Sequence, residues 1–563
     1  MNRIERTLNA LCLRAASLYG GLCLRHFLRL SARADVVNTR LLHRLLRKNR
    51  DTEFGRSHGF DRIRSVEDYR LAVPFTEYAD YRGAVERMAA EGEQGLLTEE
   101  PVRFLARTSG TAGAVKRIPV VPSSYRPYFR CEAIFFHIGV RWVRKTAPCW
   151  GRGLNTVEAE SLITPGGIRE GFISAYAIGR IRHLLAAIGC IPAAVYGYGD
   201  GVDMKYIKAR YALADRDLLF MMSVFMSTLT DLMSYIEENS ELLLRDIATG
   251  AIDGSIALPP ELRRRLERGL RPDPKRAADL REVFACPSEE PLIRRIWPRM
   301  RVILAIGTGE FAPFTEKMRS LCGPEVRFCY EMYAASESLI GSVIEMESPD
   351  YLLIPDSSFY EFLPVGDESA RPLLLHDLKV GGLYEIVLTT RSGLYRYRIR
   401  DVVRVTGHVG KCPLIRFAYR KNQLINVTGV KLTSEQITAA IRRFEDVSGL
   451  SVTDYSLCPD TGSAPWRLSV YLEPDGALPE GGERLPELLD ETLSLENAEY
   501  GRMLRIGEVA PCAVSVVAKG TYSRYRSAKV RDCGSANQLK AVRILDNPEK
   551  QRFFEDAVIR RFR

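Results

Sequence analysis

The sequence predicts a mixed α/β protein. A large N-terminal domain of β-sheets and helices covers residues 1–415, and a small α+β C-terminal domain covers residues 420–563. Three observations support this class: helical periodicity dominates residues 1–105, short apolar runs cut by glycine and proline follow from Thr108, and helix and strand patterns alternate after Arg420. With 46% hydrophobic and 27% charged residues among 563, the composition is globular and excludes a disordered or fibrous chain.

The first predicted helix lies within residues 1–30, where Arg14, Arg25 and Arg29 interrupt an apolar stretch. Its longest uncharged run, Ala15–Leu24, is shorter than the about 20 residues that a helix needs to span a bilayer. No small-residue cleavage site of a signal peptide follows it. We therefore expect an amphipathic helix that packs on the body of the protein. The alternative is an interfacial membrane helix with arginine on its polar face.

The remaining elements follow from apolar periodicity. Helices are expected at Asn38–Arg50, Glu67–Arg70, Glu77–Met88, Asp215–Thr249, Ser434–Phe444 and Leu485–Leu495. Strands are expected at Val302–Ile306, Arg467–Leu472 and Ala513–Val517, and residues 338–406 alternate apolar and polar positions as a strand-rich region does.

Charge and cysteine usage narrow the function classes. The formal net charge of +10 is compatible with an anionic partner. We expect no nucleic acid, because the basic residues are dispersed and neither an RNA-recognition signature nor a helix-turn-helix signature is present. The 12 cysteines form no CxxC pair and the seven histidines form no HExxH motif, which argues against structural zinc and a disulfide framework. Reduced thiols and a cytoplasmic location are the simpler interpretation.

Thr108-Ser109-Gly110-Thr111-Ala112-Gly113-Ala114-Val115-Lys116 is the first stretch that carries chemistry. Two glycines free the backbone to turn tightly, three hydroxyls and successive N–H groups can face an anion, and a lysine follows. This is what a polyphosphate cradle requires, although the spacing is not that of a Walker A loop. A plain polar turn before the strand at residues 118–120 is the alternative.

Two further stretches combine aromatic rings with carboxylates. Tyr333 and Glu337 are four residues apart, so that a ring could stack on a base and a carboxylate could hold Mg²⁺ near phosphates. Asp401 stands in an apolar and basic strand context. It either pairs with Arg396 or Arg398, or it accepts hydrogen bonds from sugar hydroxyls.

In this order, the three stretches make the chain resemble the adenylate-forming superfamily of acyl-CoA synthetases, luciferases and peptide-synthetase adenylation domains. More specifically, it resembles the auxin-responsive acyl-acid amido synthetases, the Gretchen Hagen family. The resemblance covers nearly the whole chain, and its most specific stretch is Gly393 to Val405. Further matching stretches are Leu45–Gly55, Val73–Phe75, Lys116–Val120, Ile296–Pro298, Gly307–Gly309, Tyr333–Glu337, Tyr360–Pro364, Gly382–Glu385, Asn497–Tyr500 and Gln538–Lys540.

The resemblance implies a ligase that uses ATP and Mg²⁺ in two half-reactions. A carboxylic acid is first adenylated to acyl-AMP, and an amine, usually that of an amino acid, then displaces AMP to give an amide. The small C-terminal domain would rotate over the large domain between the two steps. The implied substrates are therefore a carboxylic acid and an amine, and we expect a monomer.

The resemblance also implies residue roles. Phosphate contacts fall to Ser109, Gly110, Thr111 and Lys116. Gly307, Thr308 and Gly309 would line the adenine or the nascent acyl phosphate, Tyr333 would stack on adenine, and Glu337 would hold Mg²⁺. Asp401 would take the ribose hydroxyls, Arg420 would contact nucleotide near the interdomain hinge, and Lys540 would reach the α-phosphate.

The sequence departs from the family pattern at Ala112, at Ala335 and, most notably, at Arg400, which replaces the usual glycine before the ribose aspartate. Arg400 could pair with Asp401 or reach a phosphate. For the wall of the acid pocket, residues 220–232 and 195–202 are candidates, with an ordinary core helix as the alternative. Two other functions stay open: an adenylate-forming enzyme with a thiol acceptor, and a non-catalytic nucleotide-binding relative.

Overall fold

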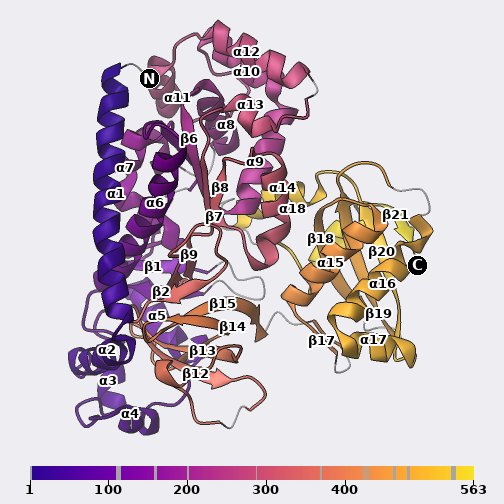
Figure 1. The fold of residues 1–563 in the computed structure, drawn as a ribbon. Helices are drawn as coiled ribbons and strands as arrows, with labels where there is room; N and C mark the ends of the chain where they lie inside the picture. Colours follow the sequence, from indigo (N-terminus) through magenta and orange to yellow (C-terminus); the bar gives the residue numbers. More distant parts are fainter. Residues whose placement is uncertain are drawn as a thin grey trace. The chain divides into compact units, whose positions relative to one another are not determined.

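The computed structural model describes residues 3–108, 116–157, 161–198, 202–286, 288–367, 370–421, 425–427, 430–460, 465–478, 482–533 and 541–562. Its contacts group into two compact units. The first unit comprises Met1–Ile306 and Arg319–Arg416, and the second comprises Gly307–Met318 and Phe417–Arg563. Figure 1 shows the course of the chain.

The first unit begins with the predicted run of helices. These are α1 (Arg3–Ser31), α2 (Ala34–Lys48), α3 (Glu53–Ser57), α4 (Val66–Ala72) and α5 (Tyr78–Glu91). Ser65 and Glu77 form capping boxes at the starts of α4 and α5, and Gly92 ends α5 in a left-handed conformation. Further along follow α6 (Tyr125–Thr146), α7 (Ile173–Ile188), α8 (Met204–Ala214), α9 (Met226–Glu238), α10 (Ser240–Thr249), α11 (Pro260–Gly269), α12 (Pro274–Ala285) and α13 (Leu292–Ile296).

Three sheets build the first unit. A seven-stranded sheet has the order β12-β13-β14-β15-β11-β10-β9, and two four-stranded sheets have the orders β2-β1-β5-β4 and β3-β6-β7-β8. The seven-stranded sheet contains β9 (Met332–Ala334), β10 (Leu339–Ser342), β11 (Tyr351–Leu353), β12 (Phe359–Pro364), β13 (Leu383–Thr389), β14 (Tyr397–Val409) and β15 (Cys412–Arg420). The four-stranded sheets contain β1 (Phe104–Arg107), β2 (Arg117–Val120), β4 (Ser161–Ile163) and β5 (Arg169–Gly171), and then β3 (Arg152–Asn155), β6 (Leu218–Phe225), β7 (Val302–Ile306) and β8 (Arg327–Cys329). The predicted strand-rich region after Ser338 is confirmed.

The predicted helix over Asp215–Thr249 is wrong in its first part. Residues 218–225 form β6, which pairs in parallel with both β3 and β7, and the helices α9 and α10 begin only after it. A parallel strand is covered on both faces, so it reads as a continuous apolar run without alternation. Met221 and Met226 are accordingly buried in the core, which favours the core interpretation of these side chains over a pocket wall.

The second unit has its own sheet and core. Its sheet has the order β18-β19-β20-β21, and a separate hairpin pairs β16 with β17. Its elements are β16 (Ile425–Val427), β17 (Val430–Leu432), α15 (Ser434–Ser448), β18 (Val452–Asp460), β19 (Trp466–Pro474), α16 (Leu485–Glu496), α17 (Ala498–Arg505), β20 (Val509–Val517), α18 (Thr521–Cys533), α19 (Pro548–Glu555) and β21 (Val558–Phe562). The predicted helices and strands of this region are confirmed.

The grouping of residues 307–318 with the second unit was not foreseen from the sequence. Phe314, in α14 (Ala312–Ser320), lies under the guanidinium groups of Arg526 and Arg543, with ring distances of 5.8 and 5.7 Å. Both arginines bind the buried Asp454. These contacts between distant parts of the chain leave no local signal in the sequence.

Candidate functional site

The seven-stranded sheet brings two of the predicted site residues into direct contact. The Tyr333 hydroxyl, on β9, donates a hydrogen bond of 2.7 Å to Oδ2 of Asp401, on β14. β9 and β14 are not neighbours in the sheet order, so the sheet must curl for this bond to form. Asp401 is 1% exposed, and the bond holds its carboxylate at the end of the tyrosine ring. An aromatic ring beside a buried carboxylate suits a flat base joined to a sugar.

Glu337 lies in the same sheet region and contacts another tyrosine. The Tyr397 hydroxyl donates to Oε1 of Glu337 at 3.5 Å. Burial raises the pKa of Tyr397, and the charge of Glu337 and this hydrogen bond raise it further, so the phenol stays protonated and acts as the donor. Tyr333, Glu337 and Asp401 are thus gathered at one place from β9, the turn after it and β14.

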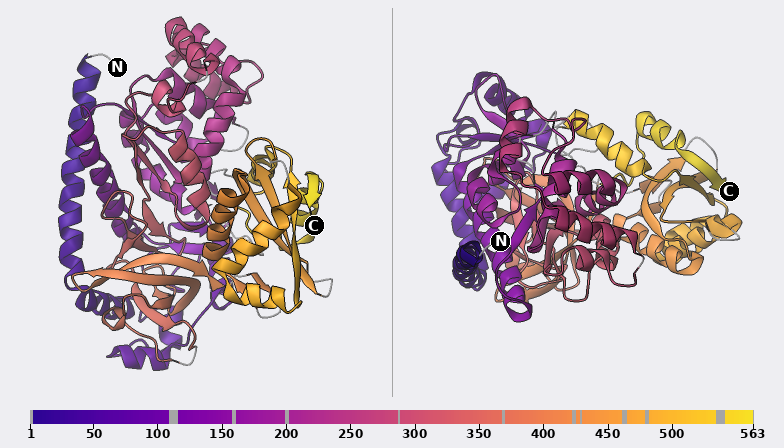
Figure 2. Two further views of the ribbon diagram at one scale, coloured as in Figure 1. Left: turned by 45° about the vertical axis from the view of Figure 1, so that its right-hand side comes forward. Right: turned by 90° about the horizontal axis from the view of Figure 1, so that it is seen from above.

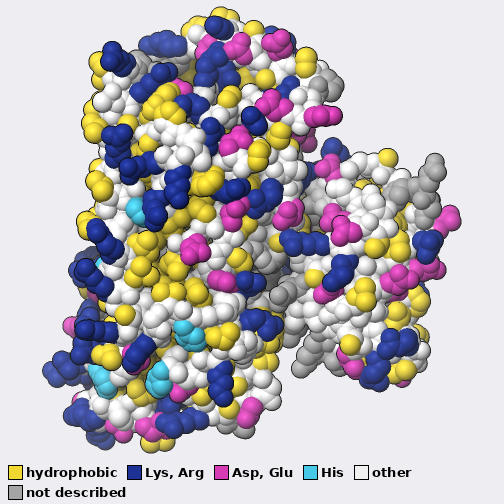
Figure 3. All heavy atoms as spheres, in the orientation of Figure 1, with side chains coloured by type: hydrophobic (Ala, Val, Ile, Leu, Met, Phe, Trp, Pro, Cys, Tyr) yellow, Lys and Arg dark blue, Asp and Glu magenta, His cyan; other side chains and the backbone are white. Residues whose placement is uncertain are grey.

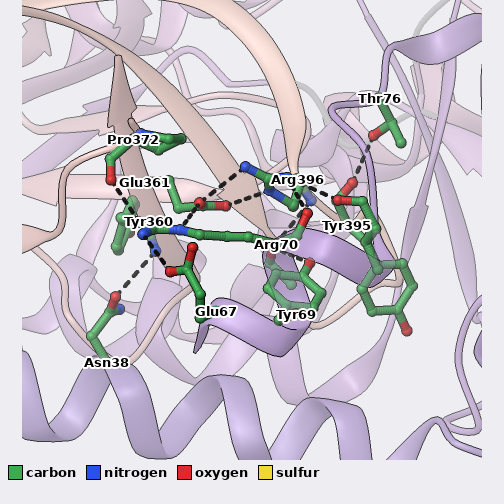
Figure 4. Close-up of polar contacts among 12 residues, drawn as sticks. Asn38, Glu67, Tyr69, Arg70, Thr76, Tyr360, Glu361, Pro372, Tyr395 and Arg396 are labelled. Carbon is green, nitrogen blue, oxygen red and sulfur yellow. Dashed lines mark hydrogen bonds and ion pairs between the residues drawn. The ribbon is translucent and has the colours of Figure 1, made fainter. Parts of the chain in front are cut away.

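The arginines beside Asp401 bind other carboxylates. Arg396 Nε donates to Oε2 of Glu361 at 2.9 Å, and Arg398 binds Glu385 through two hydrogen bonds of 2.7 Å. Figure 4 shows Arg396 and Arg70 converging on Glu361, with Arg70 Nε 3.0 Å from Oε1. Arg396 and Arg398, the two arginines expected as possible partners of Asp401, thus form ion pairs with other carboxylates.

Arg400 also points away from its neighbour Asp401. Its guanidinium forms an ion pair with Glu77, which caps α5. The Arg400 backbone has a φ of 65°, in the left-handed region that glycine adopts without a side-chain clash. This conformation explains why the family pattern has glycine here, and the arginine adds its charge to a surface ion pair.

We expect the stability of Arg400 variants to follow this backbone strain. Arg400→Gly should be more stable than Arg400→Ala by about 1 kcal/mol, because both lose the Glu77 ion pair and only alanine keeps a Cβ at positive φ. Urea denaturation of the two variants measures the difference. Both should keep the KM for ATP of the parent protein, and a large rise in KM for either would mean that Arg400 contacts the nucleotide.

The predicted phosphate loop connects β1 to β2 as a hairpin. Arg107 pairs with Arg117, and the N–H of Thr108 donates to the carbonyl of Lys116 at 3.0 Å. At the root of this loop the Thr108 hydroxyl oxygen is buried, and none of the described residues forms a hydrogen bond with it. Lys116 Nζ lies 5.6 Å from the centre of the Tyr78 ring. Ser109, Gly110 and Thr111 lie outside the described residues, as does Lys540.

The remaining predicted residues belong to the second unit. The carbonyl of Gly307 accepts a hydrogen bond of 2.8 Å from the Thr315 hydroxyl. Thr308 precedes the short helical turn that leads into α14, and Gly309 begins that turn with a φ of 59°. Arg420 is the last residue of β15, just past the point where the two units divide. The structure therefore divides the predicted residues between two units.

Two buried acidic side chains of the first unit were not predicted from the sequence as candidate functional residues. Glu132 of α6 and Glu331, the residue before β9, lie near each other and near Tyr128. Burial raises the pKa of Glu132 to about 8 and raises that of Glu331 well above its usual value, with the charge of Glu132 adding to the second effect. The residues are far apart in the chain, and only the packing of α6 against β8 and β10 brings them together.

We expect Glu132→Gln to stabilise the protein at alkaline pH. A carboxyl whose folded pKa is about 8 and whose usual value is 4.5 costs stability as pH rises between these values, because the folded state holds a proton that the unfolded state has lost. The amide removes this cost, which the difference between the two pKa values places at about 5 kcal/mol.

The measurement is urea denaturation at pH 5 and pH 9, with Glu487→Gln as an exposed control. The variant should match the parent at pH 5 and exceed it at pH 9. An equal gain at both pH values would contradict the pKa assignment.

Among the described residues no group of three or more His, Cys, Asp or Glu side chains could hold a metal ion. Glu337 is a single carboxylate. Mg²⁺ is commonly bound by one or two carboxylates together with substrate phosphates, so Glu337 fits an ion that arrives with a nucleotide rather than a permanent metal centre.

Comparison with known proteins places this chain in a family. Residues 23–326 match the GH3 family N-terminal domain, residues 351–420 its central domain and residues 435–549 its C-terminal domain. Among relatives, the indole-3-acetic acid-amido synthetase GH3.10 of Arabidopsis thaliana is 27% identical over 583 residues, covering 95% of this chain and 97% of that relative.

Solved structures show the same fold. The acyl acid amido synthetase AtGH3.15, in complex with 2,4-DB, superposes with a TM-score of 0.85 at 22% identity and covers 96% of this chain and 97% of its own. A 2-hydroxyisobutyryl-CoA ligase in the postadenylation state has a TM-score of 0.51 at 12% identity, with coverage of 95% and 90%. The predicted fold class is therefore confirmed, and the chain belongs to the GH3 family.

Proposed function

We propose that the chain is an ATP-dependent acyl-acid amido synthetase. It adenylates a carboxylic acid and then transfers the acyl group to an amine, and the relatives that are named amido synthetases support the formation of an amide. The observation that carries the proposal is the hydrogen-bonded pair of Tyr333 and Asp401, with Glu337 beside it, in a chain of this family.

In the first half-reaction, a carboxylate oxygen of the acid attacks the α-phosphorus of ATP and pyrophosphate leaves. Asp401 would accept hydrogen bonds from the ribose hydroxyls, since a carboxylate that already accepts one bond from Tyr333 has further lone pairs. The Tyr333 ring, whose hydroxyl is held by that bond, would stack on the adenine. The loop between β1 and β2 would bind the phosphates, and the buried Thr108 hydroxyl at its root, which has no partner among the described residues, could donate a hydrogen bond to one of them.

Glu337 would hold Mg²⁺, and the ion when bound would neutralise charge on the phosphates. Tyr397 supports this role by orienting the carboxylate of Glu337 through its protonated hydroxyl. Lys116 would add a mobile positive charge at the end of the phosphate loop.

In the second half-reaction, the amine nitrogen attacks the acyl carbon, the bond to AMP breaks, and a proton leaves the nitrogen. We propose that the C-terminal domain, residues 420–563, rotates between the two steps and carries Lys540 to the α-phosphate, with Arg420 near the hinge. We also propose a monomer in the cytoplasm, which the free thiols of the described cysteines support.

The test is acid-dependent exchange between ATP and pyrophosphate, run over a panel of aromatic and aliphatic acids beside Asp401→Ala. Exchange with some acids that vanishes in the variant supports adenylation at this site. With the acid fixed, product masses after incubation with amino acids or with coenzyme A separate an amide-forming enzyme from one with a thiol acceptor. ATP binding without exchange for any acid would favour a non-catalytic relative.

A further inference from the structure

The helix α1 is apolar on two opposite faces. Its buried face carries Leu13, Gly20, Cys23 and Phe27 and packs along α6. Its solvent face carries a second stripe at alternating spacings of four and three residues, which places the side chains on one side of a helix. The members of this stripe are Ile4, Leu8, Leu11, Ala15, Leu18 and Leu22, and the five large ones are between 55 and 73% exposed.

The charge around this stripe has one sign. Arg25 and Arg29 continue the same spacing beyond Leu22, and Arg14 lies beside the stripe; all three are exposed. Glu5 is the only acidic residue in the sequence of α1, and it lies 3.7 Å from Arg152. Along the margin where α1 runs, Figure 3 shows mostly yellow and dark blue side chains.

The neighbouring helix α6 extends the basic surface. Burial lowers the pKa of the His137 imidazole, and the positive charges of Arg141, Arg144 and Arg25 add to this effect. Arg141 and Arg144 are exposed on α6. Exposed arginines of both helices therefore lie near His137, where α1 and α6 pack together. Figure 2 shows the long helix α1 in indigo at the edge of the first unit.

We propose that the exposed face of α1 docks the protein on an anionic lipid bilayer. Leucine side chains would enter the boundary between head groups and acyl chains, and the arginines would bind lipid phosphates. This inference is independent of the proposed function, because none of these residues belongs to the nucleotide site.

The helix would lie on the bilayer rather than cross it. By length and composition alone, α1 is long and apolar enough to span a membrane. Its other face is, however, bonded to the protein body. Asn9 Oδ1 accepts a hydrogen bond of 2.9 Å from the Gly151 N–H, and Ser17 Oγ lies 3.0 Å from His137 Nδ1. Insertion across the bilayer would break these contacts and leave polar groups without partners in hydrocarbon.

The charge pattern also argues against a second copy of the chain as the occupant. A seam between two such helices would bring Arg14, Arg25 and Arg29 of each copy to one interface, where Glu5 alone could offset them. A pairing seam commonly carries complementary charges on its flanks, and α1 lacks them. An anionic surface complements the arginines directly.

The experiment is co-sedimentation of the full chain with vesicles of phosphatidylcholine alone and of phosphatidylcholine mixed with phosphatidylglycerol. We expect binding to the mixed vesicles only, weakened by salt. Leu18→Gln with Leu22→Gln should lower the partition coefficient about tenfold or more. The matched control, Leu71→Gln with Leu495→Gln, removes two leucines elsewhere that are even more exposed and should leave the partition coefficient unchanged.

A second pair of variants tests the arginines. Arg25→Gln with Arg29→Gln should lower the partition coefficient about tenfold. The control, Arg62→Gln with Arg484→Gln, removes two exposed arginines elsewhere and should leave it unchanged. Light scattering without vesicles reports the oligomeric state. The proposal is overturned by equal binding to both vesicles, by no binding to either, by leucine variants that bind like the parent, or by a dimer that Leu18→Gln with Leu22→Gln dissociates.

Discussion

Asp401→Ala should reduce acid-dependent ATP–pyrophosphate exchange by about 100-fold or more. Hydrogen bonds to a charged group contribute about 1.5–3 kcal/mol each, and a carboxylate that binds two ribose hydroxyls would lose two of them. The variant also removes the acceptor of the partly buried Tyr333 hydroxyl. The measurement is exchange at several ATP concentrations, which separates a rise in KM from a fall in kcat.

Two further variants separate the carboxylate from its support. Asp401→Asn keeps an oxygen that can accept from Tyr333 and should lose less than alanine does. Tyr333→Phe keeps the ring and removes only the hydroxyl, so it should raise the KM for ATP modestly while exchange persists. If Asp401→Ala exchanges as fast as the parent protein, the assignment of this residue to the ribose fails.

The helices and strands with strong apolar periodicity could be predicted from the sequence, whereas features that depend on packing between distant segments could not. The N-terminal helices and the strand Val302–Ile306 were predicted because their apolar spacing is local. The strand β6 was predicted as a helix, because a fully covered parallel strand has no alternation. The same limit applies to Glu132 and Glu331, whose proximity depends on how α6 packs.

For the candidate site, the sequence likewise indicated the residues but not the contacts that they make. Motif order along the chain was enough to single out Tyr333, Glu337 and Asp401, and the structure adds the bonds that orient them. The motif order could not reveal that Arg400 pairs with Glu77, because a left-handed backbone and a partner more than three hundred positions away leave no local pattern in the sequence. The roles assigned to these residues stay predictions until variants are measured.

The carboxylate of Glu361 supports the segment that leads to Asp401. It is 1% exposed and binds Arg70 and Arg396, whose side chains are 8 and 6% exposed. Arg396 has a φ of 47° and also donates to the carbonyl of Val73 at 2.8 Å, so Glu361 holds a strained turn against the end of α4. β14 and Asp401 follow directly after this turn.

Glu361→Gln should therefore destabilise the first unit by about 3–5 kcal/mol, because it leaves two buried guanidinium groups without their shared negative charge. Urea denaturation, followed by a probe in the first unit, measures the loss. Glu67→Gln is the matched control: Glu67 binds the same Arg70 at 3.4 Å, but its side chain is 53% exposed, so its loss should stay within about 0.5 kcal/mol. Equal denaturation midpoints for the two variants would show that the Glu361 network contributes no more than a surface ion pair, and the turn before β14 would then need another support.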